Sequence, residues 1–216
     1  MARQIAHEIK NPLTPMKLSI QFMQKRFEEK SENREEHLKQ VSKTLIEQIN
    51  ALSSIATAFS NFAKMPTAKN EELNLIDILQ HVISLFRNDS FDLKLQLNDI
   101  ENADVFVDRE QFVRVFVNLI NNAIQSIPDD REGQIVIEIE EQKEYYQASV
   151  IDNGLGIKSE VKEKLFYPNF TTKSGGMGLG LAIVKNIVEN AKGKIWVESE
   201  ENVGSCFFVK IPKYKL

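Results

Sequence analysis

The 216-residue sequence lacks several features that would tie it to a membrane, an oxidising compartment or nucleic acid. It has no run of about 18 apolar residues, the length that spans a bilayer, and no visible signal peptide. Its single cysteine, Cys206, cannot form an internal disulfide and is expected to be buried as a small apolar residue. A net charge of −4 provides no basic face for nucleic acid. We therefore expect no nucleic-acid partner and no membrane contact by this segment.

Glycine is absent from residues 1–65, where apolar residues recur every three or four positions. This spacing predicts two long helices joined by a polar turn at 31–36, which together form an αα-hairpin. One hairpin covers only part of such long stripes, whereas two hairpins paired as a four-helix bundle bury the rest. We therefore predict a homodimer whose subunits meet along the second stripe. The two stripes are Leu13, Met16, Ile20, Met23 and Phe27, then Leu38, Val41, Leu45, Leu52, Ile55, Phe59 and Phe62.

A group of polar residues near the start of the first helix suggests chemistry at His7. Glu8 is adjacent and can accept the proton of one ring nitrogen, which leaves the other nitrogen as a nucleophile. Asn11 lies one turn further along and can orient a water molecule or a phosphoryl oxygen. Pro12 removes a helix hydrogen bond and should bend the helix. The other two histidines, His37 and His81, lack such neighbours and are expected to be structural.

Two glycine clusters mark a candidate anion site in the second half of the chain. Asp152, Gly154 and Gly156 follow a strand-like run, and a later cluster from Gly175 to Gly180 leads directly into a helical pattern. Glycines let backbone N–H groups approach a ligand closely, and the start of a helix attracts anions such as a polyphosphate. A flexible hairpin between a strand and a helix is the alternative interpretation.

Two asparagines upstream of these clusters add a candidate cation ligand. Asn118 and Asn122 are four residues apart and so share one face of an otherwise apolar helix. A carboxamide oxygen suits Mg²⁺ alongside phosphate oxygens, so Asn122 is the predicted metal ligand. A helix surface that merely carries three asparagines is the alternative.

In this order and spacing, the motifs resemble the ATP-binding domain of sensor histidine kinases, the Bergerat or GHKL fold. The N box corresponds to 118–123, the first glycine box to 152–156, and the second glycine box to 176–181. Phe166 and Phe170 resemble the F box, and Gly204-Ser205-x-Phe207 resembles the closing GTxF strand. The sequence HEIKNP at 7–12 resembles the H box of the nitrogen-regulation type. The ATP-binding resemblance covers roughly the last two-thirds of the chain, and no Walker motif occurs in it.

The resemblance assigns roles to individual residues. His7 would be the phosphoacceptor, Glu8 its general base, and Asn11 a residue for phosphatase activity. Asp152 would accept the adenine amine, and Asn122 would bind Mg²⁺. Residues 158–176 would form a mobile lid over ATP. The full set expected to bind ATP is Asn118, Asn122, Asp152, Gly154, Gly156, Phe170, Thr171, Thr172, Lys173, Gly176, Gly178, Leu179, Gly180 and Ser205.

The remaining patterns predict an α+β chain with two domains. The hairpin occupies 1–65, a linker with Pro66 occupies 66–72, and the ATP-binding domain occupies 73–216. In that domain Asn74 is the predicted N-cap of a helix, and another helix spans 109–127. Helices would cover one mixed sheet as a two-layer α/β sandwich. The predicted strands lie at 93–97, 105–107, 135–139, 146–151, 195–198 and 206–211.

Three classes of function fit these motifs, and we favour the first. A histidine kinase would autophosphorylate His7 with ATP and Mg²⁺ and pass the phosphoryl group to an aspartate on a response-regulator receiver domain. A GHKL ATPase of the gyrase or chaperone kind carries Glu where this chain has Asn118, because attack by water needs a general base. A nucleotide-binding scaffold would not need every box residue. The kinase interpretation places the segment in the bacterial cytoplasm, with an upstream sensor or membrane region possible. The sequence leaves open whether phosphorylation occurs within or between subunits.

The His7→Gln variant tests the phosphoacceptor assignment. It should abolish acid-labile, base-stable labelling from γ-labelled ATP, because glutamine has no nucleophilic ring nitrogen. Nucleotide affinity should stay within a few-fold, since His7 lies in another domain, and His81→Gln should label normally. Labelling that persists in His7→Gln would remove this residue as the phosphoacceptor.

Overall fold

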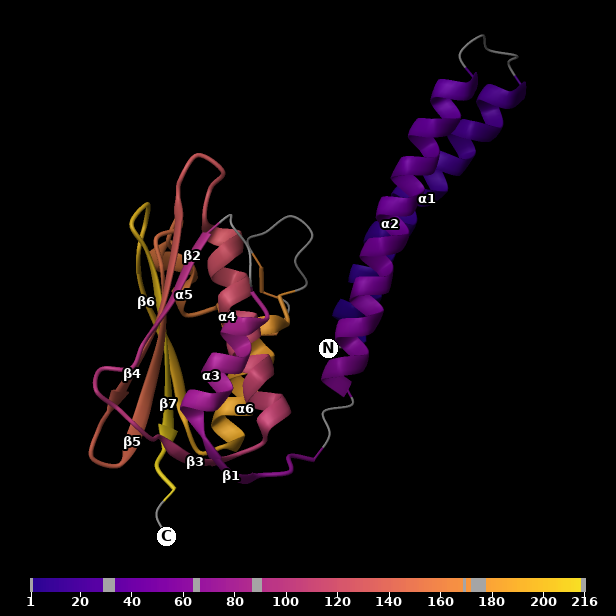
Figure 1. The fold of residues 1–216 in the computed structure, drawn as a ribbon. Coiled ribbons are helices and arrows are strands. Elements are labelled where there is room, and N and C mark those ends of the chain that lie inside the picture. Colours follow the sequence, from indigo (N-terminus) through magenta and orange to yellow (C-terminus); the bar gives the residue numbers. More distant parts are fainter. Residues whose placement is uncertain are drawn as a thin grey trace. The chain divides into compact units, whose positions relative to one another are not determined.

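A computed structural model describes residues 2–28, 34–63, 67–86, 91–168, 170–171 and 178–214. In the helical hairpin its side chains are described at 11–25, 38–50 and 52–53. The chain forms two compact units, a pair of helices and a larger α/β unit. Both are drawn in Figure 1. Among the described residues, no helix is both long and apolar enough to cross a membrane.

The first unit consists of α1 (Ala2–Glu28) and α2 (Arg34–Ala63), which pack against each other. Helix α1 continues through Pro12 and Pro15. Pro12 and Val41 are buried, and Leu45 and Leu52 are half-buried. Because α1 is the element of this unit that lies against α2, we infer that Val41, Leu45 and Leu52 of the second stripe face α1 of the same chain.

The apolar side chains that this packing leaves exposed coincide only in part with the predicted stripes. Among the described side chains of α2 they are Leu38, which belongs to the second stripe, and Ile46 and Ile49, which do not. On α1 they include Leu13 and Ile20 of the first stripe. The prediction had placed the second stripe itself between subunits, including Leu45 and Leu52. The side chains of its other members, Ile55 and Phe59, lie outside the described residues.

The larger unit is built on a five-stranded mixed sheet in the order β2-β4-β5-β7-β6. Strands β2 and β4 are parallel, and the other neighbouring pairs are antiparallel. Helices α3, α4 and α6 cover one face of the sheet, which gives two layers (Figure 1). The predicted fold class is thus confirmed. The bounds are α3 Leu75–Ser84, β2 Phe91–Gln96, α4 Arg109–Ser126, β4 Gly133–Glu141, β5 Tyr145–Asp152, α6 Gly180–Asn190, β6 Lys194–Glu200 and β7 Gly204–Pro212.

The core lies between these two layers and follows from the periodicity of the sequence. Ile135, Ile137 and Ile139 alternate along β4 and are fully buried, as expected for the covered face of a strand. Phe112 and Phe116 recur at helical spacing on α4 and are buried as well. The two patterns, with periods of two and of three to four residues, therefore meet in one apolar layer.

One prediction about the sheet was wrong. Strand β3 (Asp104–Val107) does not join the main sheet but pairs antiparallel with β1 (Glu71–Asn74) in a separate two-stranded sheet. Strand β1 was missed because four residues with two exposed glutamates show no clear alternation. Glu71 and Glu72, which we had assigned to the linker, belong to this strand.

Asn74 ends β1 and caps α3, as predicted. Its side-chain Oδ1 accepts the N–H of Ile76 at 2.9 Å and the N–H of Ala103 at 3.2 Å. One side chain therefore satisfies the first turn of α3 and also holds the segment that leads into β3.

Replacing Asn74 with alanine should lower the free energy of unfolding of the larger unit by about 1–2 kcal/mol, the usual cost of losing an N-cap. Both backbone donors lose their partner in this variant. Gln80→Ala, at an exposed position of the same helix, should change stability by less than about 0.5 kcal/mol. Urea unfolding of both variants measures the difference, and equal midpoints would show that the cap contributes nothing.

Candidate functional site: a helix that joins two polar centres

Helix α4 carries both predicted asparagines beside its buried face. Its start is capped by Asp108, whose Oδ1 accepts the N–H of Gln111 at 3.0 Å. Asn118 and Asn122 are half-buried, and Asn118 Nδ2 donates to the carbonyl of Arg114 at 2.8 Å. This bond turns the carboxamide so that its donor is used within the helix, while its oxygen points elsewhere.

The oxygen of Asn118 meets the start of α6. A Cβ atom built on Gly180 would lie 3.0 Å from Asn118 Oδ1. The N box and the second glycine box, which are far apart in the sequence, are therefore neighbours in the fold. Leu179 is the N-cap of α6 and makes no side-chain capping hydrogen bond.

This first polar centre suits magnesium and phosphate. The N–H groups at the start of α6 and the positive end of its dipole favour an anion, and the carboxamide oxygens of Asn118 and Asn122 suit a hard cation. Within the described ranges, no group of three His, Cys, Asp or Glu side chains could hold a metal ion. Carboxamide oxygens fit a cation that is shared with phosphate oxygens.

A second polar centre lies at the end of β5, where Asp152 is buried, with 5% of its surface exposed. Its Oδ1 accepts the N–H of Gly154 at 2.8 Å and is 2.9 Å from Oγ of Ser126. Both partners are donors, which offsets the cost of burying a carboxylate. Ser205 lies opposite Asp152 on β7, and its Oγ is 3.0 Å from Oγ of Ser199.

Ser126 is a site residue that the sequence interpretation missed. It is the last residue of α4 and lies four positions after Asn122, as Asn122 lies four positions after Asn118. The three polar side chains therefore form one stripe along the helix, and this spacing was a signal that could have been used. One helix thus contributes to both polar centres.

The glycines of the first box are required by the protein's own packing. A Cβ atom on Gly154 would lie 2.0 Å from Oγ of Ser126, and one on Gly156 would lie 2.0 Å from the carbonyl oxygen of Glu200. Gly156 also has a positive φ of 68°. The sequence interpretation had explained these glycines by the approach of a ligand, whereas the structure supplies a reason within the fold.

Other predicted site residues lie in regions that are described only in part. Helix α5 (Ser159–Lys162) opens the predicted lid, Phe166 and Phe170 are half-buried, and Thr171 is exposed. Asn11 is exposed on α1. The lid and the roles assigned to it stay predictions. Thr172, Lys173 and Gly176, and the side chains of His7 and Glu8, lie outside the described residues.

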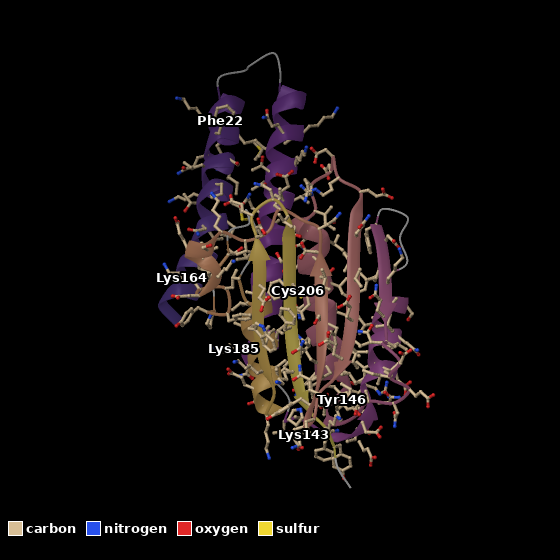
Figure 2. All side chains as sticks on the ribbon, turned by 90° about the vertical axis from the view of Figure 1, so that its left-hand side faces the viewer. Phe22, Lys143, Tyr146, Lys164, Lys185 and Cys206 are labelled. Atoms are coloured by element: carbon tan, nitrogen blue, oxygen red, sulfur yellow. The ribbon has the colours of Figure 1, made fainter. Side chains whose placement is uncertain are left out.

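Cys206 follows Ser205 on β7 and faces the opposite side of the sheet, which the helices leave uncovered (Figure 2). It is half-buried. Burial, reinforced by the nearby carboxylate of Glu198, raises the pKa of its thiol to about 12. The thiol therefore stays protonated at neutral pH. The sequence had predicted a buried cysteine, whereas the structure leaves this one half-buried.

Comparison with known families defines the class of these two units. The family described as histidine kinase-, DNA gyrase B- and HSP90-like ATPase matches residues 107–215, slightly more than half of the chain. The His Kinase A (phospho-acceptor) domain matches residues 1–68. The chain therefore belongs to the histidine kinase family, which confirms the resemblance noted in its sequence motifs.

Individual relatives agree with this assignment. A putative NtrY-like sensor histidine kinase of Rickettsia felis is 33% identical over 218 residues, which cover 100% of this chain and 36% of the relative. Nitrogen regulation protein NtrY of Azorhizobium caulinodans is 32% identical over 200 residues, 90% of this chain and 26% of that protein. The chain thus spans about a third of the length of the curated relatives it matches.

The solved structures include the nucleotide-free catalytic domain of histidine kinase ThkA. It is 38% identical with a TM-score of 0.60 and covers 67% of this chain and 96% of that chain. ThkA in complex with response regulator protein TrrA is 32% identical with a TM-score of 0.77, covering 99% of this chain and 61% of that chain.

Proposed function

We propose that this chain autophosphorylates on His7 with ATP and Mg²⁺ and passes the phosphoryl group to an aspartate of a response-regulator receiver domain. The observation that carries the proposal is the amide at Asn118, which faces the start of α6 at Gly180. A carboxamide cannot take a proton from water, so the phosphate centre contains no base for hydrolysis at this position. The acceptor must then supply its own base, as His7 and Glu8 do.

We propose that Asp152 recognises the adenine ring of the nucleotide. A buried carboxylate accepts hydrogen bonds and donates none, so it pairs with the exocyclic amine of adenine and repels the carbonyl that guanine carries at the same position. Ser205, directly opposite on β7, completes this end of the site. The phosphates would then extend toward the start of α6, where backbone N–H groups from 178–180 meet them.

Asn122 would hold Mg²⁺ through its carboxamide oxygen, and Asn118 would support the phosphates. The ion would neutralise charge on the phosphate oxygens, as divalent cations do in phosphoryl transfer. Lys173 and the threonines at 171 and 172 would add contacts from the lid. The remaining steps belong to side chains of the first unit.

At His7 the chemistry needs one nucleophilic nitrogen and one base. Glu8 would hold the proton of one ring nitrogen, so that the lone pair of the other attacks the γ-phosphorus while the bond to the ADP oxygen breaks. Asn11 would orient water for the opposite task, the removal of the phosphoryl group from the regulator's aspartate. The complex of ThkA with TrrA supports a receiver domain as partner. We place these reactions in the cytoplasm.

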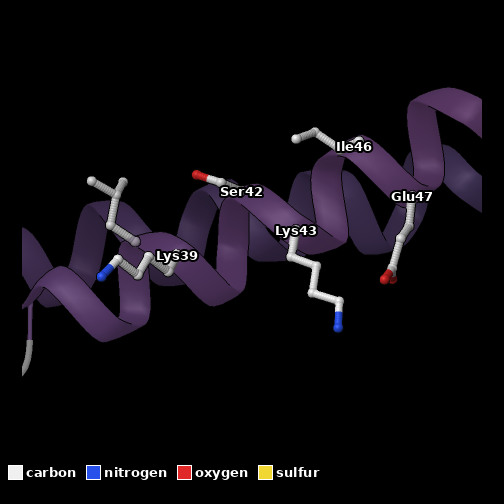
Figure 3. A pocket seen from close by; sticks show the side chains of 6 residues that line it. Lys39, Ser42, Lys43, Ile46 and Glu47 are labelled. Carbon is white, nitrogen blue, oxygen red and sulfur yellow. The ribbon is translucent and has the colours of Figure 1, made fainter.

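We also propose that the chain forms a homodimer and that the hairpin provides the interface. Three apolar side chains of α2 stay exposed beside the residues that face α1. They are Leu38, Ile46 and Ile49, with exposed fractions of 43%, 58% and 51%. A groove of about 450 Å³ on α2 runs between Leu38 and Ile46 and is edged by Lys39, Lys43 and Glu47 (Figure 3). A second hairpin would cover this apolar sector and close a four-helix bundle.

The Asp152→Asn variant tests the nucleotide site. The asparagine oxygen can still accept from Gly154 and Ser126, but its NH₂ group presents donors to the adenine amine. The free energy of ATP binding, measured by calorimetry with Mg²⁺, should become less favourable by on the order of 1–3 kcal/mol. Labelling of His7 should decrease with it. Asp92→Asn, on the exposed edge of β2, should bind ATP normally. Unchanged affinity in Asp152→Asn would place adenine elsewhere.

The Ile49→Asp variant tests the dimer. Because of two-fold symmetry, each subunit would bury one new carboxylate in the dimer interface without a partner, which is strongly unfavourable. The variant should be monomeric by light scattering at concentrations where the parent chain is dimeric. Gln40→Asp adds the same charge to an exposed position of α2 and should leave the dimer intact. A dimer of Ile49→Asp would move the interface to another surface.

A further inference from the structure

Arg131 lies in the connection between α4 and β4 and belongs to none of the boxes. Its Nη1 donates to the carbonyl oxygen of Asn153 and, at 2.9 Å, to that of Gly154. Its Nη2 donates to the carbonyl oxygen of Asn202 at 3.3 Å. One guanidinium therefore ties the loop after Asp152 to the turn between β6 and β7.

The peptide group between Asn153 and Gly154 is held from both ends. Its carbonyl accepts from Arg131, and its N–H donates to Oδ1 of Asp152. The chain has no cis peptide bond among its described residues, and the two groups of a trans peptide point in opposite directions. Arg131, this peptide and the Asp152 carboxylate are thus connected in one series of charge-assisted hydrogen bonds, in which each bond strengthens the next.

The other hydrogen bonds of the loop are made by groups outside this peptide, including the N–H of Asn153, which donates to the carbonyl of Gln134 at 3.3 Å. Asn153 Oδ1 accepts the N–H of Gln134, and its Nδ2 donates to the carbonyl of Glu132, both at 2.9 Å. The N–H of Leu155 donates to the carbonyl of Ser126 at 2.9 Å. These bonds use the side chain of Asn153 and the next peptide along the loop. A planar fork with five donors suits two adjacent carbonyls, whereas a lysine ammonium on a flexible stem does not.

We infer that Arg131 is a positioning residue for nucleotide selection: it sets the plane of the Asn153–Gly154 peptide and, through the Gly154 N–H, the direction of the Asp152 carboxylate. The inference rests on the proposed function, in which Asp152 reads adenine. Without the guanidinium the peptide can rotate, and the carboxylate loses the donor that aims it. The site should then lose preference for adenine as well as affinity for ATP.

The test measures the affinities of Arg131→Ala and Arg131→Lys for ATP and for GTP, with Mg²⁺ and the full chain. Loss of hydrogen bonds to a charged group predicts a fall in ATP affinity of about ten-fold or more. The ratio of ATP to GTP affinity should shrink in both variants, less so in Arg131→Lys. In labelling assays the KM for ATP should rise while kcat at saturating ATP changes little. Arg109→Ala removes the same charge at the far end of α4, about 25 Å away along the helix, and should leave the ratio unchanged.

The ratio separates positioning from folding, because a smaller folded fraction weakens ATP and GTP binding equally. Equal loss of affinity for both nucleotides, or no loss, would overturn the inference. If Arg131→Ala does not fold, the comparison of ATP with GTP is made on Arg131→Lys alone.

A double-mutant cycle adds a second criterion: on the Asp152→Asn background, Arg131→Ala should have little further effect on ATP affinity, whereas independent effects of the two substitutions would overturn the link between these residues. If Asp152→Asn alone leaves ATP affinity unchanged, the adenine role of Asp152 fails. If Asp152→Asn weakens binding but Arg131→Lys changes neither affinity nor ratio, only the inference about Arg131 fails.

Discussion

Burial of one side of α4 against the sheet is the constraint on which both polar centres depend. Phe112, Phe116, Leu119 and Ile120 are all buried on this side, so the helix can neither rotate nor slide without opening the core. Asn118 and Ser126 are eight residues apart on this helix, about 12 Å along its axis, which sets the separation between the start of α6 and the end of β5. Asn118 is thereby held beside Gly180, and Ser126 beside Asp152. The rigid helix thus fixes the separation between the buried carboxylate of Asp152 and the uncapped start of α6.

The glycines of the two boxes have different physical roles in this arrangement. In the first box, Gly154 and Gly156 permit the close approach of Ser126 and of the Glu200 carbonyl, so a side chain there would push the loop off its support. In the second box, Gly180 leaves space beside the Asn118 oxygen at an uncapped helix start. The first box therefore shapes the loop that presents Asp152, and the second leaves donors available for an anion. A shared residue type does not imply a shared function.

The choice of amide over carboxylate at Asn118 separates this chain from ATPases built on the same fold. A glutamate at that place supplies a base for water, whereas an asparagine offers only neutral donors and an acceptor. In the function that we propose, the base comes with the nucleophile, as Glu8 next to His7. On that proposal, the amide at Asn118 is the reason why the first unit carries its own base.

Local periodicity in the sequence predicted most of the elements. Alternation in β4, the N-cap at Asn74 and the helical spacing in α4 could be recognised because each depends on neighbours within a few residues. The class of the chain came instead from the resemblance of its boxes, in their order and spacing, to those of sensor histidine kinases.

Tertiary structure decided the rest, because those contacts join residues that are distant in the sequence. The pairing of β1 with β3 and the bonds of Ser126 are examples. Arg131 shows the limit most clearly, since it bonds to carbonyls 22, 23 and 71 positions away. A backbone carbonyl has no sequence signature, so only the folded chain shows which ones an arginine reaches.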